Sequence, residues 1–100
     1  MIRHIVMWKF KEYAEGKSKQ ENMEIVKDKL YSLVPMLSII KRMEIGFDIL
    51  KTDASMDLVL LTEFDSLDDL KAYANSPEHL AVGEYIKKVV EIRVVHDSEI

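Results

Sequence analysis

Residues 2–10, IRHIVMWKF, form the stretch that decides the fold. They are rich in β-branched and aromatic residues, which predicts a β-strand, and successive side chains of a strand point to opposite sides of its sheet. Both sides of this strand are apolar at its centre: one carries His4, Val6, Trp8 and Phe10, and the other carries Ile5 and Met7. A sheet with helices on one side needs apolar side chains on that side alone. The second apolar side must therefore be covered by something else.

A strand predicted over residues 57–64, DLVLLTEF, repeats the two-sided pattern, because Leu58 and Leu60 point one way and the residues between them point the other. The apolar residues expected on the side without helices are Ile5, Met7, Val59 and Leu61. On a monomer they would form one exposed apolar patch, and such patches usually mark an interface. Two sheets packed face to face about a twofold axis would cover it, so the sequence predicts a homodimer.

The first helix and the next strand follow from local patterns. Ser18 and Glu21 fit a capping box, in which each residue bonds the other's backbone amide, and this predicts the start of a helix. Apolar residues at spacings of three and four continue to Leu33 or Val34, where we expect the helix to end. Residues 12–17 are expected to be a loop, and the alternation over residues 40–50 predicts a strand.

The second helix is interrupted. It begins after Ser66, breaks at residues 75–77 (NSP), and is expected to continue to about Val90, before a last strand over residues 91–97. The order β-α-β-β-α-β predicts an α+β, ferredoxin-like protomer. Such a protomer has a four-stranded antiparallel sheet with its helices on one face.

Length and composition limit the class of protein. A chain of 100 residues predicts one domain, over residues 1–100. The net charge of −4 disfavours nucleic acid and anionic membranes as partners, and no apolar run is long enough to span a membrane. The chain has no cysteine, which excludes disulfides, thiolate metal sites and a thiol nucleophile. We therefore expect a soluble, cytoplasmic protein.

The helix break carries the first candidate site residues. Ser76 can cap the second piece and Pro77 suits its first position, which places His79 at the third position of the helix. The positive end of the helix dipole disfavours imidazolium, so we expect His79 to be neutral and able to accept a proton. Tyr73 lies on the apolar side of the preceding piece. The alternative is a plain kink between two helices, with a structural histidine in its first turn.

His4 is expected on the helix-covered side of the first strand, where it can reach the same space as the Tyr73 and His79 side chains. As a buried histidine it needs hydrogen-bond partners, and it can equally be a structural residue at the edge of the core. The three histidines share no close spacing, so a metal site has no support from the sequence.

The sequence resembles the Dabb family, the stress-responsive dimeric α/β-barrel domains, over nearly the whole chain. The resemblance rests on the opening IRHIVMWKFK, the run TEFDSLDDLKAYANSPEH, the GEY that follows it and the closing RVVHD. It implies a ferredoxin-like protomer and a homodimer whose two sheets form a barrel.

Plant polyketide cyclases of this family use a Tyr and a His for an intramolecular aldol condensation, and Tyr73 and His79 match this pair. His4 matches a pocket histidine of the first strand, whereas Leu58 stands where the cyclases have a further histidine. The resemblance implies that His79 removes a proton next to a carbonyl, that Tyr73 orients it or stabilises the enolate, and that neither metal nor organic cofactor is needed.

Two functions remain open from the sequence. The first is a stress-associated homodimer that binds a small apolar carbonyl or aromatic molecule between sheet and helices, without an assignable reaction. The second is a cofactor-independent, cyclase-like enzyme with His79 and Tyr73 as its catalytic pair. In both, the expected ligand-binding residues are His4, Val6, Trp8, Leu58 and Leu60.

Overall fold

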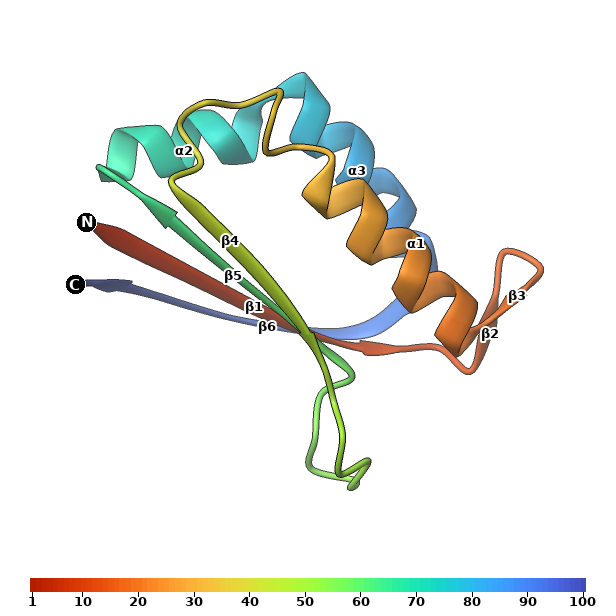
Figure 1. The fold of residues 1–100 in the computed structure, drawn as a ribbon. Coiled ribbons are helices and arrows are strands. Elements are labelled where there is room, and N and C mark those ends of the chain that lie inside the picture. The colour runs from red at the N-terminus through yellow and green to blue at the C-terminus, as the bar shows by residue number, and fades with distance from the viewer.

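The computed structural model describes all 100 residues and contains a four-stranded antiparallel sheet with three helices on one face (Figure 1). The sheet has the strand order β4-β5-β1-β6. Its strands are β1 (Ile2–Phe10), β4 (Arg42–Phe47), β5 (Leu58–Phe64) and β6 (Val90–Glu99). The helices are α1 (Lys19–Tyr31), α2 (Leu67–Asn75) and α3 (Pro77–Val89). This is the ferredoxin-like α+β fold, as the order of predicted elements implied.

The helix starts follow the predicted caps. The Ser18 side chain accepts from the amide of Glu21, and the Glu21 carboxylate accepts from the amide of Ser18, which completes the capping box. α1 ends at Tyr31, two or three residues earlier than expected, because the chain closes short turns there. Leu33 N–H donates to the Leu30 carbonyl and Val34 N–H donates to the Tyr31 carbonyl. The predicted break between α2 and α3 is confirmed.

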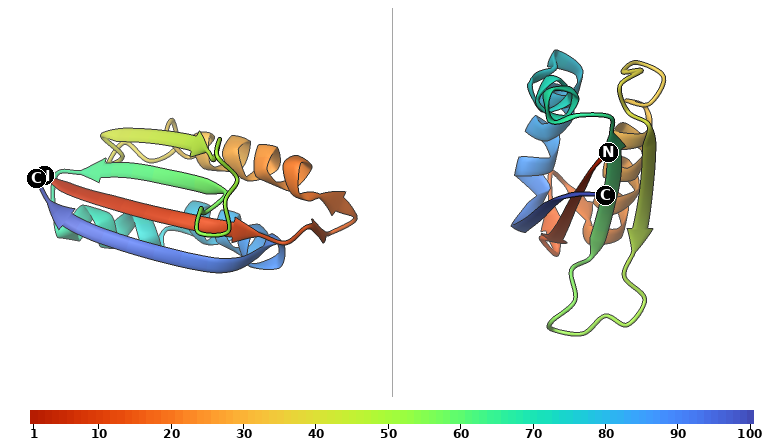
Figure 2. Two further views of the ribbon diagram at one scale, coloured as in Figure 1. Left: turned by 90° about the horizontal axis from the view of Figure 1, so that it is seen from below. Right: turned by 90° about the vertical axis from the view of Figure 1, so that its left-hand side faces the viewer.

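The two sides of the sheet divide as the alternation predicted. Antiparallel pairing places Val6 opposite Leu60 and Trp8 opposite Leu58, and these four residues are buried beneath the helices. Met7 pairs with Val59 on the other side, where it is 37 % exposed. Views from below and from the end show that no helix covers this second side (Figure 2). The uncovered side is called the open face below.

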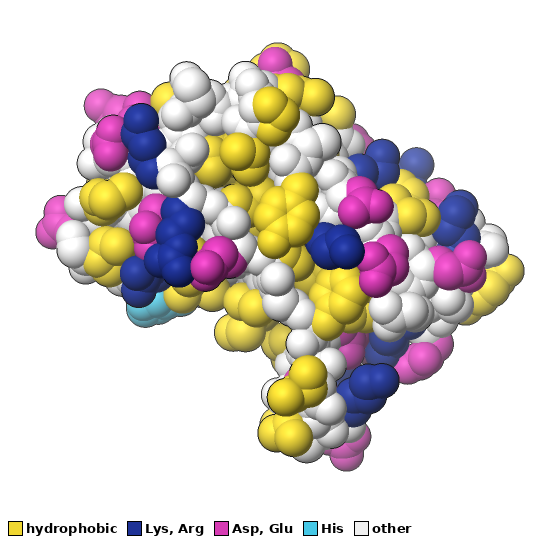
Figure 3. Space-filling view, in the orientation of Figure 1, with side chains coloured by type: hydrophobic (Ala, Val, Ile, Leu, Met, Phe, Trp, Pro, Cys, Tyr) yellow, Lys and Arg dark blue, Asp and Glu magenta, His cyan; other side chains and the backbone are white.

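The loop between β4 and β5 corrects the expected strand over residues 40–50. β4 ends at Phe47, because the carboxylate of Asp48 accepts from the amide of Lys51 and turns the chain out of the sheet. Ile49 is consequently 88 % exposed instead of continuing the apolar side of the strand, and its neighbour Leu50 is 75 % exposed. The loop projects on the side of the open face, with hydrophobic side chains at its tip (Figures 1 and 3).

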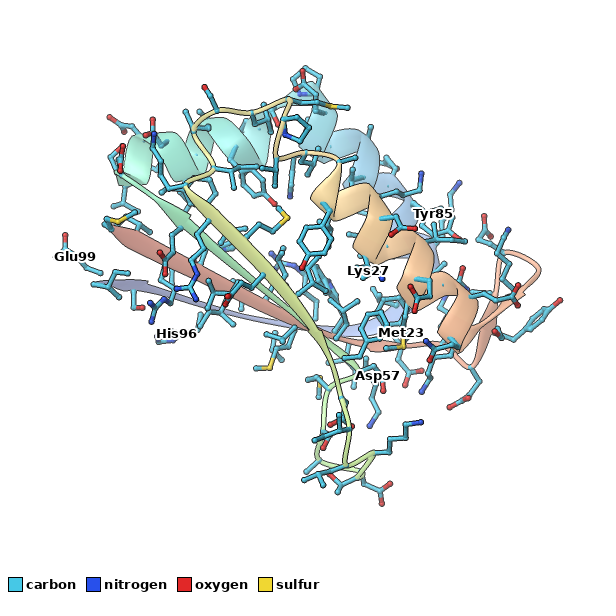
Figure 4. The ribbon with its side chains drawn as sticks, viewed as in Figure 1. Met23, Lys27, Asp57, Tyr85, His96 and Glu99 are labelled. Atoms are coloured by element: carbon cyan, nitrogen blue, oxygen red, sulfur yellow. The ribbon has the colours of Figure 1, made fainter.

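Residues 12–17 also differ from the expected loop, since they contain a short hairpin, β2 (Tyr13–Ala14) and β3 (Lys17–Ser18). Asn22 of α1, which is fully buried, holds the hairpin by donating to the Ala14 carbonyl at 3.0 Å. The hydroxyl of Tyr85, which extends from α3 (Figure 4), donates to the Asn22 side-chain oxygen at 2.6 Å. One amide side chain therefore links the hairpin, α1 and α3.

Replacing Asn22 by alanine is expected to lower the free energy of unfolding by about 2 kcal/mol, because it leaves the Ala14 carbonyl and the Tyr85 hydroxyl unpaired. Urea unfolding at one fixed protein concentration measures the change. Gln20→Ala, at an exposed position of the same helix, is the control and should change stability by less than about 0.5 kcal/mol. Equal effects in both variants would contradict the structural role of Asn22.

Candidate functional site

A cavity of about 410 Å³ lies between the sheet and the helices. Its walls come from all three helices and from β1, β5 and β6, and nine of its fifteen lining residues are hydrophobic. Four of the five expected ligand-binding residues line it, as does the expected catalytic pair: His4, Val6, Trp8, Leu60, Tyr73 and His79. Mostly apolar walls with a few convergent polar groups are typical of small-molecule sites.

The expectation for Leu58 has to be corrected, since it does not line the cavity. Leu58 is on the predicted side of β5, but it pairs with Trp8 and Phe47 at the start of that strand. It is 1 % exposed and belongs to the hydrophobic core. Its position along the strand, which alternation does not specify, keeps it away from the cavity.

The break between the helices holds the catalytic candidates in place. Ser76 caps both pieces: its backbone N–H and its hydroxyl donate to the Tyr73 carbonyl at the end of α2, and its hydroxyl oxygen accepts from the His79 amide of α3. Pro77 occupies the first position of α3, where a missing N–H leaves no bond unmade. The NSP interruption therefore turns His79 toward the end of α2.

His79 is held in one neutral tautomer. Its Nδ1 lies 3.2 Å from the carbonyl oxygen of Ala74, which can only accept, so Nδ1 carries the proton and Nε2 is the free basic nitrogen. Burial lowers the pKa of His79 below its ordinary value of 6.5, and the charges of His4 and Arg93 lower it further, although the Ala74 carbonyl opposes them. The direction agrees with the sequence-based expectation, but burial is the main cause.

Tyr73 is almost completely buried, at 1 % exposure, and its ring packs between two others. The centroid of the Tyr73 ring lies 5.0 Å from the centroid of the Phe64 ring and 4.5 Å from that of the His79 ring, and the ring planes are tilted in both pairs. The hydroxyl is buried without a hydrogen-bond partner, and burial raises the pKa of Tyr73 to about 12. The phenol is therefore a neutral donor at every physiological pH.

His4 is oriented by a carboxylate. β1 and β6 pair so that His4 lies opposite Asp97, and the His4 Nδ1 and an Asp97 carboxylate oxygen are hydrogen-bonded. Because the carboxylate accepts, Nδ1 carries the proton, as in other carboxylate-oriented histidines. The third histidine, His96, is on the open face, on the other side of the sheet from the cavity (Figure 4).

Trp8 was expected at the cavity, and its indole N–H is buried without a partner, like the Tyr73 hydroxyl. Other lining residues were not anticipated from the sequence. Glu84, Lys87 and Arg93 bring charge to the cavity where α3 meets β6. For Arg93 a signal existed, because alternation along the last strand places it on the helix side.

The chain contains no cluster of His, Asp or Glu side chains suited to hold a metal ion. None of its helices has the length and apolar character needed to cross a membrane.

Fold and cavity together define a ferredoxin-like α+β domain with a pocket between its two layers. Residues 2–100 match the model of the Dabb family, the stress responsive A/B barrel domain, and the chain belongs to this family. No curated protein matches the sequence significantly.

Solved structures resemble it along its whole length. A dimeric ferredoxin-like protein of unknown function from Bacteroides fragilis is 31 % identical, with a TM-score of 0.87 over 99 % of this chain and 95 % of its own. A dimeric ferredoxin-like protein from Thermobifida fusca is 22 % identical, with a TM-score of 0.84 over 99 % and 90 %. Hydroxynitrile lyase from Passiflora edulis is 21 % identical, with a TM-score of 0.81 over 97 % and 90 %. The last two likenesses establish the fold alone.

Proposed function

We propose that this Dabb domain is a homodimer that binds a small, largely apolar carbonyl or aromatic molecule in the cavity of each protomer. The observation that carries the proposal is the pair of buried donors without partners, the Tyr73 hydroxyl and the Trp8 indole N–H, at the wall of an apolar cavity. A buried donor without a partner costs about 1–3 kcal/mol. A ligand oxygen that accepted a hydrogen bond from either donor would remove this cost for that donor.

Gly83 supports the same function. It lies inside α3, where glycine costs about 1 kcal/mol relative to alanine, and it lines the cavity. No close packing requires glycine there, since a Cβ atom at this position would meet nothing within 4 Å. The missing side chain keeps the cavity wide.

Filling the cavity from this position is expected to block binding. With benzylacetone as the probe and the fluorescence of Trp8, the only tryptophan, as the signal, Gly83→Phe should weaken binding by roughly tenfold or more. Ala81→Phe, at an exposed position of α3 outside the cavity, is the matched control and should bind normally. Equal affinity in the two variants would exclude this cavity as the binding site.

The open face is the surface through which we propose that the homodimer forms. Its apolar centre comprises Ile5, Met7, Val59 and Leu61, and Ile92 and Val94 of β6 extend it with exposures of 42 % and 39 %. Glu63, bonded by Arg3 and Arg42, borders this centre with charge. An apolar centre with a charged rim is typical of a protein interface. The relatives described as dimeric support the assignment, and a barrel of two packed sheets is the arrangement we propose.

A second candidate function is cofactor-independent proton transfer, with His79 as general base. It is favoured by the bond from Nδ1 to the Ala74 carbonyl, which leaves Nε2 basic, and by the neutral Tyr73 donor beside the ring. His4 would position the substrate carbonyl or hydroxyl. A His79→Gln variant that loses proton exchange on a bound ketone is the corresponding test.

A cytoplasmic location of the protein stays a prediction.

A further inference from the structure

Arg93 is a charged residue on the helix side of the sheet. It pairs with Trp8 across β1 and β6, on the helix side, and lines the cavity. β6 is an edge strand, and the Arg93 side chain is exposed, so the guanidinium is available from solvent and from the cavity.

The other charged groups of the cavity already have partners. Glu84 pairs with Lys87 at 3.8 Å, and His4 is hydrogen-bonded to Asp97. Arg93 forms no ion pair and no side-chain hydrogen bond, in contrast to Arg3 and Arg42, which share Glu63. One positive charge is therefore left over at the wall of a mostly hydrophobic cavity.

We propose that Arg93 binds the carboxylate of a ligand whose apolar body fills the cavity. The inference rests on the proposed binding function and narrows its ligand to aryl or alkyl carboxylic acids. A guanidinium presents parallel N–H donors that match a carboxylate, and such paired, charge-assisted bonds are stronger and more directional than neutral ones. The hydrophobic walls disfavour a small hydrated anion, since it has no apolar surface to bury.

The test compares an acid with its neutral amide of the same shape. Hydrocinnamate and hydrocinnamamide are titrated into the intact protein, with Trp8 fluorescence as the signal. The wild type is expected to bind the acid about tenfold more tightly than the amide, in line with a charge-assisted bond. Arg93→Gln should abolish this preference, because the acid loses its charge-assisted bonds and therefore loses much more affinity than the amide.

Lys88→Gln is the control for net charge, because Lys88 lies on α3 outside the cavity and its replacement removes the same charge. It should keep the full preference for the acid. A second signal is the NMR titration of His79. The titratable and charged groups around His79 are His4 from β1, Arg93 from β6 and Tyr73 from α2. Because the positive charge of Arg93 lowers the pKa of His79, bound hydrocinnamate, which neutralises that charge, should raise this pKa.

The outcomes separate the two proposals. Equal binding of acid and amide, or a preference that survives in Arg93→Gln, overturns the role of Arg93 and leaves the binding function intact. If neither compound binds, nor benzylacetone, the cavity is not a binding site and both proposals fall.

Discussion

Met7→Lys is expected to convert the protein from a dimer into a monomer of 11.6 kDa at micromolar concentration. Met7 lies at the centre of the open face, with Val59 on one neighbouring strand and Val94 on the other. Neither neighbour can pair with an ammonium group, and Lys9 follows on the same side of β1. By twofold symmetry each dimer would bury two unpaired charges. Several kcal/mol per buried charge corresponds to a loss of about a thousandfold or more in dimer affinity.

Sedimentation equilibrium measures the mass, and circular dichroism checks that the monomer keeps its fold. Leu67→Lys is the matched control, because Leu67 is 54 % exposed on α2, on the helix side of the sheet. It should remain dimeric. A wild-type protein that sediments as a monomer would remove the homodimer from the proposed function, whereas a dimeric Met7→Lys variant would show that another surface forms it.

The assignment of residues to the two faces of the sheet was predictable, because it depends only on the alternation of side chains along each strand. Side chains of a strand alternate regardless of what covers them, so the positions of Val6, Trp8 and Met7 followed from the sequence. The helix starts were predictable for the same reason, since Ser18 and Ser66 bond amides only three residues away.

The predictions that were wrong concern the position at which a helix or strand ends. Ile49 continues the alternation of β4, but Asp48 caps a turn and takes it out of the sheet. Such ends are set by competing side-chain bonds that a periodic pattern does not contain.

The candidate site was predictable in part. The NSP interruption identified Tyr73 and His79, because a capping serine and a proline act locally. The unpartnered Trp8 N–H, the open space at Gly83 and the unpaired Arg93 depend on how three layers of chain meet. Residue type alone could not distinguish these from an ordinary core tryptophan, a helix glycine and a surface arginine.

His79→Gln is expected to abolish proton exchange on a bound ketone if the second candidate function is correct. In deuterium oxide, the neutral Nε2 of His79 would take a proton from the carbon next to the carbonyl of benzylacetone and return a deuteron. A positioned general base contributes about a hundredfold to ten-thousandfold, so the protein-dependent exchange should fall by at least about a hundredfold. NMR follows the loss of the ketone's α-proton signals, and Trp8 fluorescence verifies that the variant still binds.

His96→Gln is the matched control, since it removes a histidine from the opposite side of the sheet, and it should exchange like the wild type. The basic form of His79 is required, so exchange should be constant at neutral pH and decline only as the pH falls through the pKa of His79. That decline should lie below 6.5, because burial lowers this pKa. Exchange that survives in His79→Gln, or that already declines above pH 6.5, would leave the domain as a binding protein without this chemistry.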